Sequence, residues 1–180
     1  LTGKPVMVAW TRDEEFFYDN FHPAGVIKIK SGVDKAGLIK LWDYHAYFSG
    51  TRGAEVIYNI PNARVTDHGR KENAPAVHPF DTGPWRAPNN NTNTFAKEVQ
   101  IDIMAAGSKT DPVEFRFKNL KDPKMEACLK AVAERFGYVP GKTPTGRGIG
   151  VALGTDVGTW VAMMVEVKVD IKSGQVKVIR

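Results

Sequence analysis

Cysteine is almost absent from this chain: Cys128 is the single cysteine among 180 residues. One thiol cannot form a disulfide within the chain, and it does not reveal the redox compartment. Cys128 falls on the apolar stripe of a predicted helix, so we interpret it as a buried and inert thiol. Apolar runs are also short, and none approaches the roughly 18 residues that a membrane-spanning helix needs. The sequence therefore predicts no internal disulfide and no membrane span.

Clustered charge and several familiar catalytic motifs are also missing. The 25 basic residues exceed the 20 acidic ones by only five, and they are scattered, so we expect no nucleic-acid partner. No serine stands in a G-x-S-x-G elbow. The glycines of 146–150 precede a strand pattern, whereas a dinucleotide-binding loop opens a helix. The four histidines lack the spacing of metal ligands, so the sequence predicts no metal ligand and no catalytic residue.

The order of the patterns predicts the fold class. The chain is 42% hydrophobic and 25% charged, as in globular proteins. Strand patterns come first, helical patterns follow, and strand patterns return, which indicates an α+β fold with mixed or antiparallel strands flanking a central cluster of helices. We expect one α+β region over 1–180. Within it, 1–67 is strand-rich, 68–94 is a long loop, 95–137 is helical and 146–180 returns to strands.

The first segment combines a strand pattern with a helix start. The apolar run of 6–10 predicts a buried strand. Thr11 and Glu14 then match a capping box, in which each side chain bonds the other residue's backbone N–H. A short helical turn over 15–18 should follow.

Two strand patterns come next, over 25–31 and 38–48. Gly37 lies in the segment between them and supplies the positive φ that a hairpin turn often requires. Both faces of the second strand are apolar or aromatic, so we expect it to be central and covered on both sides.

The middle of the chain, 50–94, carries five prolines and a run of asparagines, so it indicates two short strands followed by a long ordered loop. A helix over 95–106 should then place Phe95, Val99 and Met104 on its packed face. Two further helices should start at the Asp-Pro pairs of 111–112 and 122–123. We expect Gly137 to end the last one.

The tail, from residue 148 onward, reads as strands. Val161, Met163 and the valines at 165, 167 and 169 alternate with polar residues and predict one face of a strand. A turn over 170–174 should lead to a last strand that contains Val176 and Val178.

The segment 82–89 is the one that suggests chemistry. Arg86 stands among prolines and small residues, behind Trp85, in a loop that leads into a helix. Small residues let backbone N–H groups approach an anion, and a guanidinium offers a planar fork of donors. A helix N-terminus nearby adds to this preference. The residues alone leave two interpretations open: an anion-binding Arg86, or a structural Arg86 that bonds carbonyls of a tight loop.

Residues 83–88, together with 93–98 and 101–102, resemble the molybdenum hydroxylases of the xanthine dehydrogenase and aldehyde oxidase family. More narrowly, they resemble the isoquinoline 1-oxidoreductase beta-subunit type. Three further stretches agree in order: 8–14 with 22–24, then 111–116 with 119–120, and finally 146–152 with 161–162, 166–167 and 169–170. Together they cover nearly the whole chain.

The resemblance implies a cofactor. In that family the large subunit carries a molybdenum ion on a pterin dithiolene (molybdopterin), commonly as the cytosine dinucleotide. The matching loop implies that Arg86, with Trp85 and Ala87, contacts the pterin near the metal. Relatives have a glycine-rich stretch after this arginine, where Ala87, Pro88 and Asn89 stand here.

Two family segments are missing, and their absence bears on partners. Neither the Gly-x-Gly-Glu segment with the catalytic glutamate nor the glutamine-bearing, glycine-rich segment occurs. The resemblance therefore implies an internal part of the molybdenum subunit, inactive alone, with the remainder of that subunit and an iron–sulfur subunit carrying 2Fe-2S clusters as partners. It also implies oxidation of an aldehyde or N-heterocycle with water as oxygen source. The alternative is a non-catalytic α+β module whose Trp85-Arg86 loop docks a protein partner.

Overall fold

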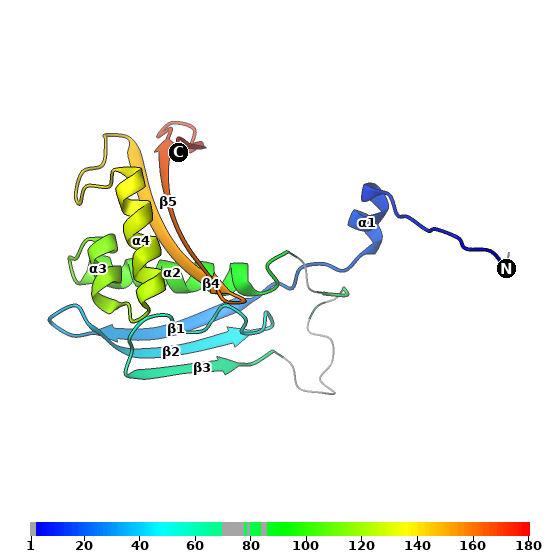
Figure 1. The fold of residues 1–180 in the computed structure, drawn as a ribbon, viewed down its shortest axis with the longest axis horizontal. Helices are drawn as coiled ribbons and strands as arrows, with labels where there is room; N and C mark the ends of the chain where they lie inside the picture. The colour runs from blue at the N-terminus through cyan, green and yellow to red at the C-terminus, as the bar shows by residue number, and fades with distance from the viewer. Residues whose placement is uncertain (1–2, 70–77, 79, 84–85) are drawn as a thin grey trace.

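The computed structural model describes residues 3–69, 78, 80–83 and 86–180. This part of the chain forms two three-stranded sheets and four helices, and the helices α2, α3 and α4 lie between the sheets (Figure 1). The elements are α1 (Arg12–Tyr18), β1 (Val26–Val33), β2 (Ile39–Tyr47), β3 (Asn62–Asp67), α2 (Asn90–Gly107), α3 (Pro112–Asn119), α4 (Pro123–Phe136), β4 (Arg147–Asp156), β5 (Thr159–Val169) and β6 (Val176–Val178). The predicted α+β class, with mixed and antiparallel strands flanking helices, is confirmed.

The first sheet has the order β1-β2-β3 and is mixed. β1 pairs antiparallel with β2, and the turn between them uses Gly37 at φ +76°, as expected. β3 pairs parallel with β2, so both strands end at the same edge of the sheet. β2 is the central strand, but only one of its faces is fully buried. On the other face, Leu41 is 48% exposed. The prediction of cover on both faces of β2 is therefore wrong.

The second sheet, β4-β5-β6, is antiparallel and packs on α4 and α2 through one face. The predicted alternation along β5 is present. Met164 and Glu166 lie on the buried face, whereas Val161 and Met163 lie on the exposed one. Gly146 directly precedes β4, Gly148 and Gly150 lie within it, and none of them opens a helix, as the sequence predicts. No helix in the described part of the chain is long and apolar enough to cross a membrane.

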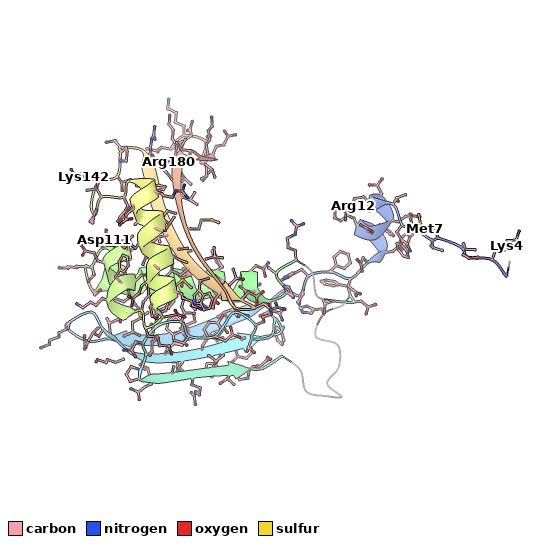
Figure 2. All side chains as sticks on the ribbon, viewed as in Figure 1. Lys4, Met7, Arg12, Asp111, Lys142 and Arg180 are labelled. Atoms are coloured by element: carbon pink, nitrogen blue, oxygen red, sulfur yellow. The ribbon has the colours of Figure 1, made fainter. Side chains whose placement is uncertain are left out.

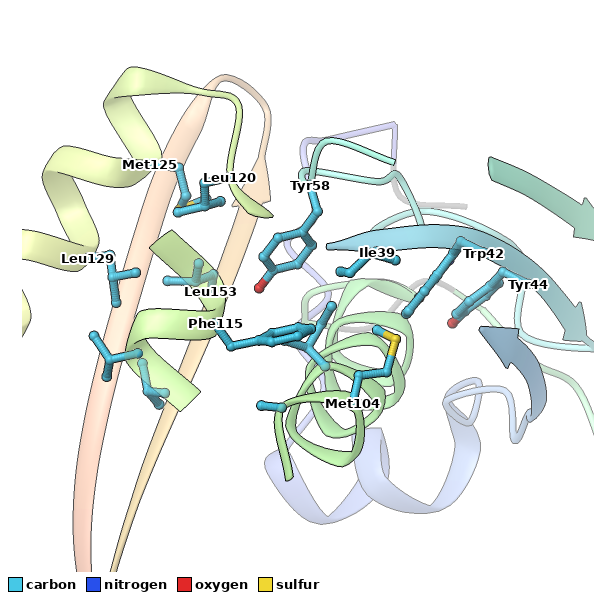
Figure 3. Packing of buried hydrophobic residues seen from close by; sticks show 14 of the residues in the cluster. Ile39, Trp42, Tyr44, Tyr58, Met104, Phe115, Leu120, Met125, Leu129 and Leu153 are labelled. Carbon is cyan, nitrogen blue, oxygen red and sulfur yellow. The ribbon is translucent and has the colours of Figure 1, made fainter. Parts of the chain in front are cut away.

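Aromatic and aliphatic side chains from both sheets and the three inner helices form a continuous core (Figure 3). Trp42 and Tyr44 of β2 face Met104 of α2 and Phe115 of α3, while Leu129 of α4 and Leu153 of β4 fill the other side. The remaining fully buried apolar residues surround these and include Ile39, Tyr58, Ile101 and Met125. Burial of this apolar area is the main stabilising contribution to the fold.

Charged side chains are buried at the centre of this core. Glu98 of α2 accepts hydrogen bonds from Arg116 Nε at 3.1 Å, from the Leu153 N–H at 2.9 Å and from the Tyr58 hydroxyl at 3.0 Å. Arg116 of α3 also donates to Asp102 at 2.7 Å. Burial raises the pKa of Glu98, although Arg116 and the Leu153 N–H favour its carboxylate form. We call Glu98, Arg116 and Tyr58 the buried ionic cluster; it joins α2, α3 and β4.

The N-terminal arm, residues 3–20, corrects one prediction. Residues 6–10 form no strand and are exposed; Met7 is 89% exposed and Trp10 55%. The arm extends away from the body, and its side chains lie uncovered (Figure 2). An apolar run makes a buried strand only where a neighbouring strand and a covering layer exist. The capping box of Thr11 and Glu14 and the short helix α1 that follows it are present as predicted.

Helix α2 corrects a second prediction. It begins at Asn90, five residues before the expected start, so asparagines assigned to the loop are helical. Phe95 and Val99 point outward, and Phe95 is 72% exposed, whereas Lys97 and Glu98 are buried beside Met104. Met104 and Ala105 are buried as predicted, but hydrogen bonds in the core bring Lys97 and Glu98 to the packed face in place of Phe95 and Val99.

The other helix boundaries agree with the sequence. Asp111 and Asp122 cap α3 and α4 through their side chains, each followed by proline. Gly137 ends α4 in the left-handed conformation. Cys128 of α4 is half-buried, with its thiol 3.8 Å from the Trp160 carbonyl. In the middle of the chain, β3 is the one regular strand of 50–69, with an isolated bridge at Tyr58.

Candidate functional site

A cavity of about 250 Å³ lies where β2 and β3 end and α2 begins. Figure 1 shows β2 and β3 pointing toward this end of the molecule, where the N-terminal arm also leaves the body. The side chains and backbone that line it come from four segments: Pro23; Phe48, Ser49 and Gly50; Asp67 and Gly69; Thr82, Gly83, Pro88 and Asn89. The segment 82–89 of the sequence analysis thus contributes four lining residues.

One wall is the start of α2. Asn89 precedes the helix in the left-handed conformation, at φ 61°, and its side chain makes no capping hydrogen bond. Other groups bond the first turn: the Asn91 side chain accepts the Thr92 N–H at 2.8 Å, and the Asn91 N–H donates to the Ala87 carbonyl at 3.3 Å. The positive dipole end of this 18-residue helix lies beside the cavity. Gly50 packs tightly here, since a Cβ on it would lie 2.7 Å from Asn89 Nδ2, and its φ of +68° also favours glycine.

Asn93, one turn into α2, fixes this wall. Its side-chain amide donates to the carbonyls of Gly50, Arg52 and Asn89 at 3.0–3.1 Å, and its Oδ1 accepts from the Tyr44 hydroxyl at 2.6 Å. Burial raises the pKa of Tyr44, so its hydroxyl stays protonated and available as this donor. One buried amide thus holds the end of β2 against the start of α2.

The opposite wall is built by a contact between distant segments. Phe21 forms a bridge with Thr82: the Phe21 N–H donates to the Asp81 carbonyl, and the Gly83 N–H donates to the Phe21 carbonyl at 3.1 Å. The rings of Phe21 and Phe80 meet edge to face. This contact brings Pro23 and residues 82–83 to the same cavity.

Unpaired polar atoms gather at this end. Among the described residues, four buried side-chain atoms lack a hydrogen-bond partner: His22 Nε2, Trp42 Nε1, Ser49 Oγ and His78 Nε2. Ser49 lines the cavity and is 1% exposed; His22 adjoins the lining residue Pro23, and the His78 ring contacts that of Phe48. Buried polar groups in native proteins almost always have partners. Of the four, only Ser49 belongs to a residue that lines the cavity, and its side chain packs against Gly25.

Of the predicted binding residues, neither Arg86 nor Ala87 lines the cavity. Trp85 falls outside the described residues. Arg86 is exposed, does not line the cavity, and makes no hydrogen bond or ion pair that the described part of the chain shows. Ala87 is exposed and left-handed, at φ 54°. The interpretation of Arg86 as a structural residue that bonds carbonyls of its loop thus finds no such bond among the described residues.

Ser49 was missed by the sequence analysis. Its signal was the Ser49-Gly50 pair, which follows β2 after one intervening residue, at a position where the backbone turns beside the end of another strand.

Two histidines lie together although their spacing in the sequence does not predict it: His45 Nδ1 lies 2.8 Å from His68 Nε2 on the outer face of the first sheet. Asp43 is the third member of that group, 3.1 Å from His45. In the described part of the chain, no group of three or more such side chains is arranged to hold a metal ion.

The chain shares its fold and part of its sequence with known proteins. The chain is 26% identical, over 160 residues, to a nicotinate dehydrogenase subunit of Pseudomonas putida, and the match covers 78% of this chain and 13% of that protein. The aldehyde oxidoreductase of Desulfovibrio gigas shares the fold over 81% of this chain and 19% of its own, with a TM-score of 0.57 and 20% identity. For the CO dehydrogenase of Oligotropha carboxidovorans the TM-score is also 0.57, at 16% identity, over 72% of this chain and 22% of that one. The chain thus spans less than a quarter of the length of each of these proteins.

Residues 1–120 match the family model described as a molybdopterin cofactor-binding domain. Molybdopterin offers several oxygen and nitrogen atoms for hydrogen bonding, and the site supplies the matching features. These are the exposed guanidinium of Arg86 and the left-handed turn at Ala87 and Asn89 that leads into α2. The residues present therefore fit such a group at this end of the chain. Because the model match covers two thirds of the sequence, the chain belongs to the molybdopterin cofactor-binding domain family.

Proposed function

We propose that this chain helps to bind the molybdenum–molybdopterin cofactor of a hydroxylase through the loop of Trp85, Arg86 and Ala87. The observation that carries the proposal is Arg86 itself. It stands in the loop that leads into α2, inside the region matched by the family model, and the described residues offer it no partner. A free, planar guanidinium is suited to bidentate binding of anionic oxygens.

The surroundings of the loop favour the same role. The left-handed backbone at Ala87 and Asn89 turns the chain sharply just before α2, and the helix start adds a positive potential. The body holds this turn in place, because Asn93 bonds the Asn89 carbonyl and Asn90 bonds the Thr155 carbonyl at 3.2 Å. A rigidly supported loop positions a binding residue more precisely than a free one.

The reaction follows from the family in outline. When bound, the cofactor supplies the redox chemistry, and the protein supplies binding, orientation and electrostatics. We propose oxidation of an aldehyde or N-heterocycle with water as the oxygen source. The cofactor would be the cytosine dinucleotide form, and electrons would pass to 2Fe-2S clusters on a partner subunit. The catalytic glutamate would belong to the remainder of the molybdenum subunit.

The narrower assignment is the isoquinoline 1-oxidoreductase beta-subunit type. Its support is the order of the matching stretches in the sequence and the similarity to a nicotinate dehydrogenase, which favours an N-heterocycle over an aldehyde. Turnover of quinoline-type heterocycles and of aldehydes by the assembled enzyme, measured side by side, separates the two substrate classes.

The test of the binding role is Arg86→Ala in the assembled enzyme, read out as molybdenum content by metal analysis. We expect the molybdenum content to fall, and Arg86→Lys to restore it only in part because an ammonium cannot form the two parallel bonds. Arg135→Ala, an exposed arginine of α4, is the matched control and should leave molybdenum unchanged.

Unchanged molybdenum content in Arg86→Ala would overturn this role. Recovery of the chain with a partner protein but without molybdenum would instead favour the non-catalytic docking module. The metal measurement and the identity of the co-purified chains therefore distinguish the two functions.

A further inference from the structure

The outer face of the first sheet carries two histidines that contact each other across neighbouring strands. His45 lies on β2, and His68 directly follows β3, where its backbone N–H donates to the Ala46 carbonyl of β2 at 2.8 Å. His45 Nδ1 lies 2.8 Å from His68 Nε2, and the planes of the two rings differ by 21°. This is a hydrogen-bond distance, so one of the two nitrogens carries a proton and the other offers a lone pair. We call these two residues the histidine pair.

Asp43 determines where the protons of the histidine pair lie. Its carboxylate accepts hydrogen bonds from Arg64 at 2.8 and 2.9 Å, and these hold the pKa of Asp43 below its usual range. An ionised carboxylate only accepts hydrogen bonds, so His45 Nε2, which lies 3.1 Å from Asp43 Oδ1, carries a proton. In the neutral pair, His45 Nδ1 is therefore the acceptor and His68 Nε2 is the donor.

This arrangement accommodates one additional proton but not two. The first can bind His68 Nδ1, for which the described residues show no hydrogen bond, and it leaves the Nε2–H donor in place. A second must bind His45 Nδ1, which sets the N–H groups of two cations face to face at 2.8 Å. Neither nitrogen then has a lone pair and the two charges repel, so the hydrogen bond is lost. Histidine is the side chain that ordinarily gains its charge between about pH 8 and pH 5.

The charged groups that face the pair make a second positive charge unfavourable. Lys28 and Lys30 of β1 lie opposite His45 and Asp43 in the strand register. Arg64 reaches the same face from β3. The carboxylate of Asp43 favours a histidine cation, but Arg64 already neutralises it. Two histidine charges side by side are thus accommodated only when the rings move apart.

His68 connects the pair to the cavity at the end of β2 and β3. Its ring stacks on Tyr47, with the ring centroids 4.3 Å apart. Its chain neighbours Asp67 and Gly69 line the cavity, and the Asp67 carboxylate accepts the Gly69 N–H at 2.8 Å. Phe48, which follows Tyr47, lines the cavity as well. Separation of the two imidazole rings therefore loosens a wall of the cavity.

We propose that the histidine pair is an acid-sensitive contact: it holds the end of β3, with the cavity wall of Asp67 and Gly69, on β2 and releases it when both imidazoles are charged. At neutral pH the hydrogen bond between the rings fixes the wall, and in mild acid the wall becomes mobile. The contact makes no use of Arg86 or of a cofactor, so it goes beyond the proposed function and fails on a separate test.

The experiment is nuclear magnetic resonance of the 180-residue chain between about pH 8 and pH 5, with the side-chain nitrogen shifts reporting the charge of each ring. A scalar coupling across the hydrogen bond, between His45 Nδ1 and His68 Nε2, should be present at neutral pH and absent when both rings are charged. Hydrogen exchange of the His68 amide, corrected for its intrinsic pH dependence, should then rise about fivefold because one hydrogen bond is lost. Exchange of the α4 amides should not change.

His68→Phe is the matched variant, because it keeps a ring beside Tyr47 and removes the hydrogen bond. Its corrected amide exchange should be the same at neutral and acid pH, and circular dichroism shows whether it is folded. His22→Phe and His78→Phe are the controls, because both histidines lie near the same cavity and outside the pair. Each should retain the acid response of the unaltered chain.

Three outcomes would overturn the proposal. One is the absence of the coupling between the two rings at neutral pH, a result that needs no variant. Another is an acid response that persists in His68→Phe. The third is loss of the response in His22→Phe or His78→Phe, which would assign it to those histidines.

Discussion

Two regions of this molecule bury polar groups, and they do so in opposite ways. In the buried ionic cluster, Glu98 receives hydrogen bonds from Arg116, Tyr58 and the Leu153 N–H. Around the cavity, the buried Ser49 hydroxyl finds no partner among the described residues. Both sets lie against α2, one at its middle and one at its start.

The difference is one of stability. A fully bonded cluster joins α2, α3 and β4. A buried hydroxyl without a partner costs stability. Variants of the ionic cluster should therefore lower stability, whereas removal of the unpaired Ser49 hydroxyl should not.

Arg116→Ala should produce the largest loss of stability. It leaves Glu98 buried without its counter-ion, and breaking a buried pair in this way costs about 3–5 kcal/mol of unfolding free energy. Chemical denaturation followed by circular dichroism measures the loss. The double variant Glu98→Gln with Arg116→Met should recover much of it, since no uncompensated charge is left. A loss below about 1 kcal/mol in Arg116→Ala would show that the cluster is not structural.

Asn93→Ala should have an intermediate effect and should reach both regions. The variant leaves the Tyr44 hydroxyl and three carbonyls without their partner, and we expect a loss of about 1–3 kcal/mol. Because Asn93 bonds the Asn89 carbonyl next to the Arg86 loop, the molybdenum content of the assembled enzyme should fall as well. Ile103→Ala, a change at an exposed residue of the same helix, should cost less stability and leave the molybdenum content unchanged. A stable Asn93→Ala variant with unchanged molybdenum content would contradict the supporting role.

Local signals in the sequence predicted the parts of the fold that local chemistry determines. The capping box of Thr11 and Glu14, the Asp-Pro helix starts and the glycine end of α4 all occur where expected. Each depends on hydrogen bonds between residues that are close in the sequence, so the residue types alone predict it. The turn at Gly37 belongs to the same group.

Predictions that depended on distant contacts were less accurate. Glu98 lies on the packed face of α2 because Arg116, which belongs to another helix, bonds its carboxylate there. The expected strand at 6–10 has no neighbouring strand among the described residues to pair with. Ser49 becomes a candidate only when β2, β3 and α2 meet at one end. The loop of Arg86 was identified early because its composition and its family resemblance are both local in sequence.

Substitution of Glu166 should have the smallest effect on stability, and the effect should vary with pH. The Glu166 side chain is buried, whereas its two arginine partners are not. Arg147 and Arg180 donate to it at 2.6 and 2.8 Å and hold its pKa below the ordinary 4.5. A lowered pKa in the folded state stabilises the fold above pH 4.5, and this stabilisation is lost as the pH falls through the folded-state pKa. Glu166→Gln should therefore be less stable than the unaltered chain at neutral pH, and the two should converge in acid. Urea midpoints measured at several pH values check this; a constant difference down to the lowest pH would mean that Glu166 acts through packing and not through its charge.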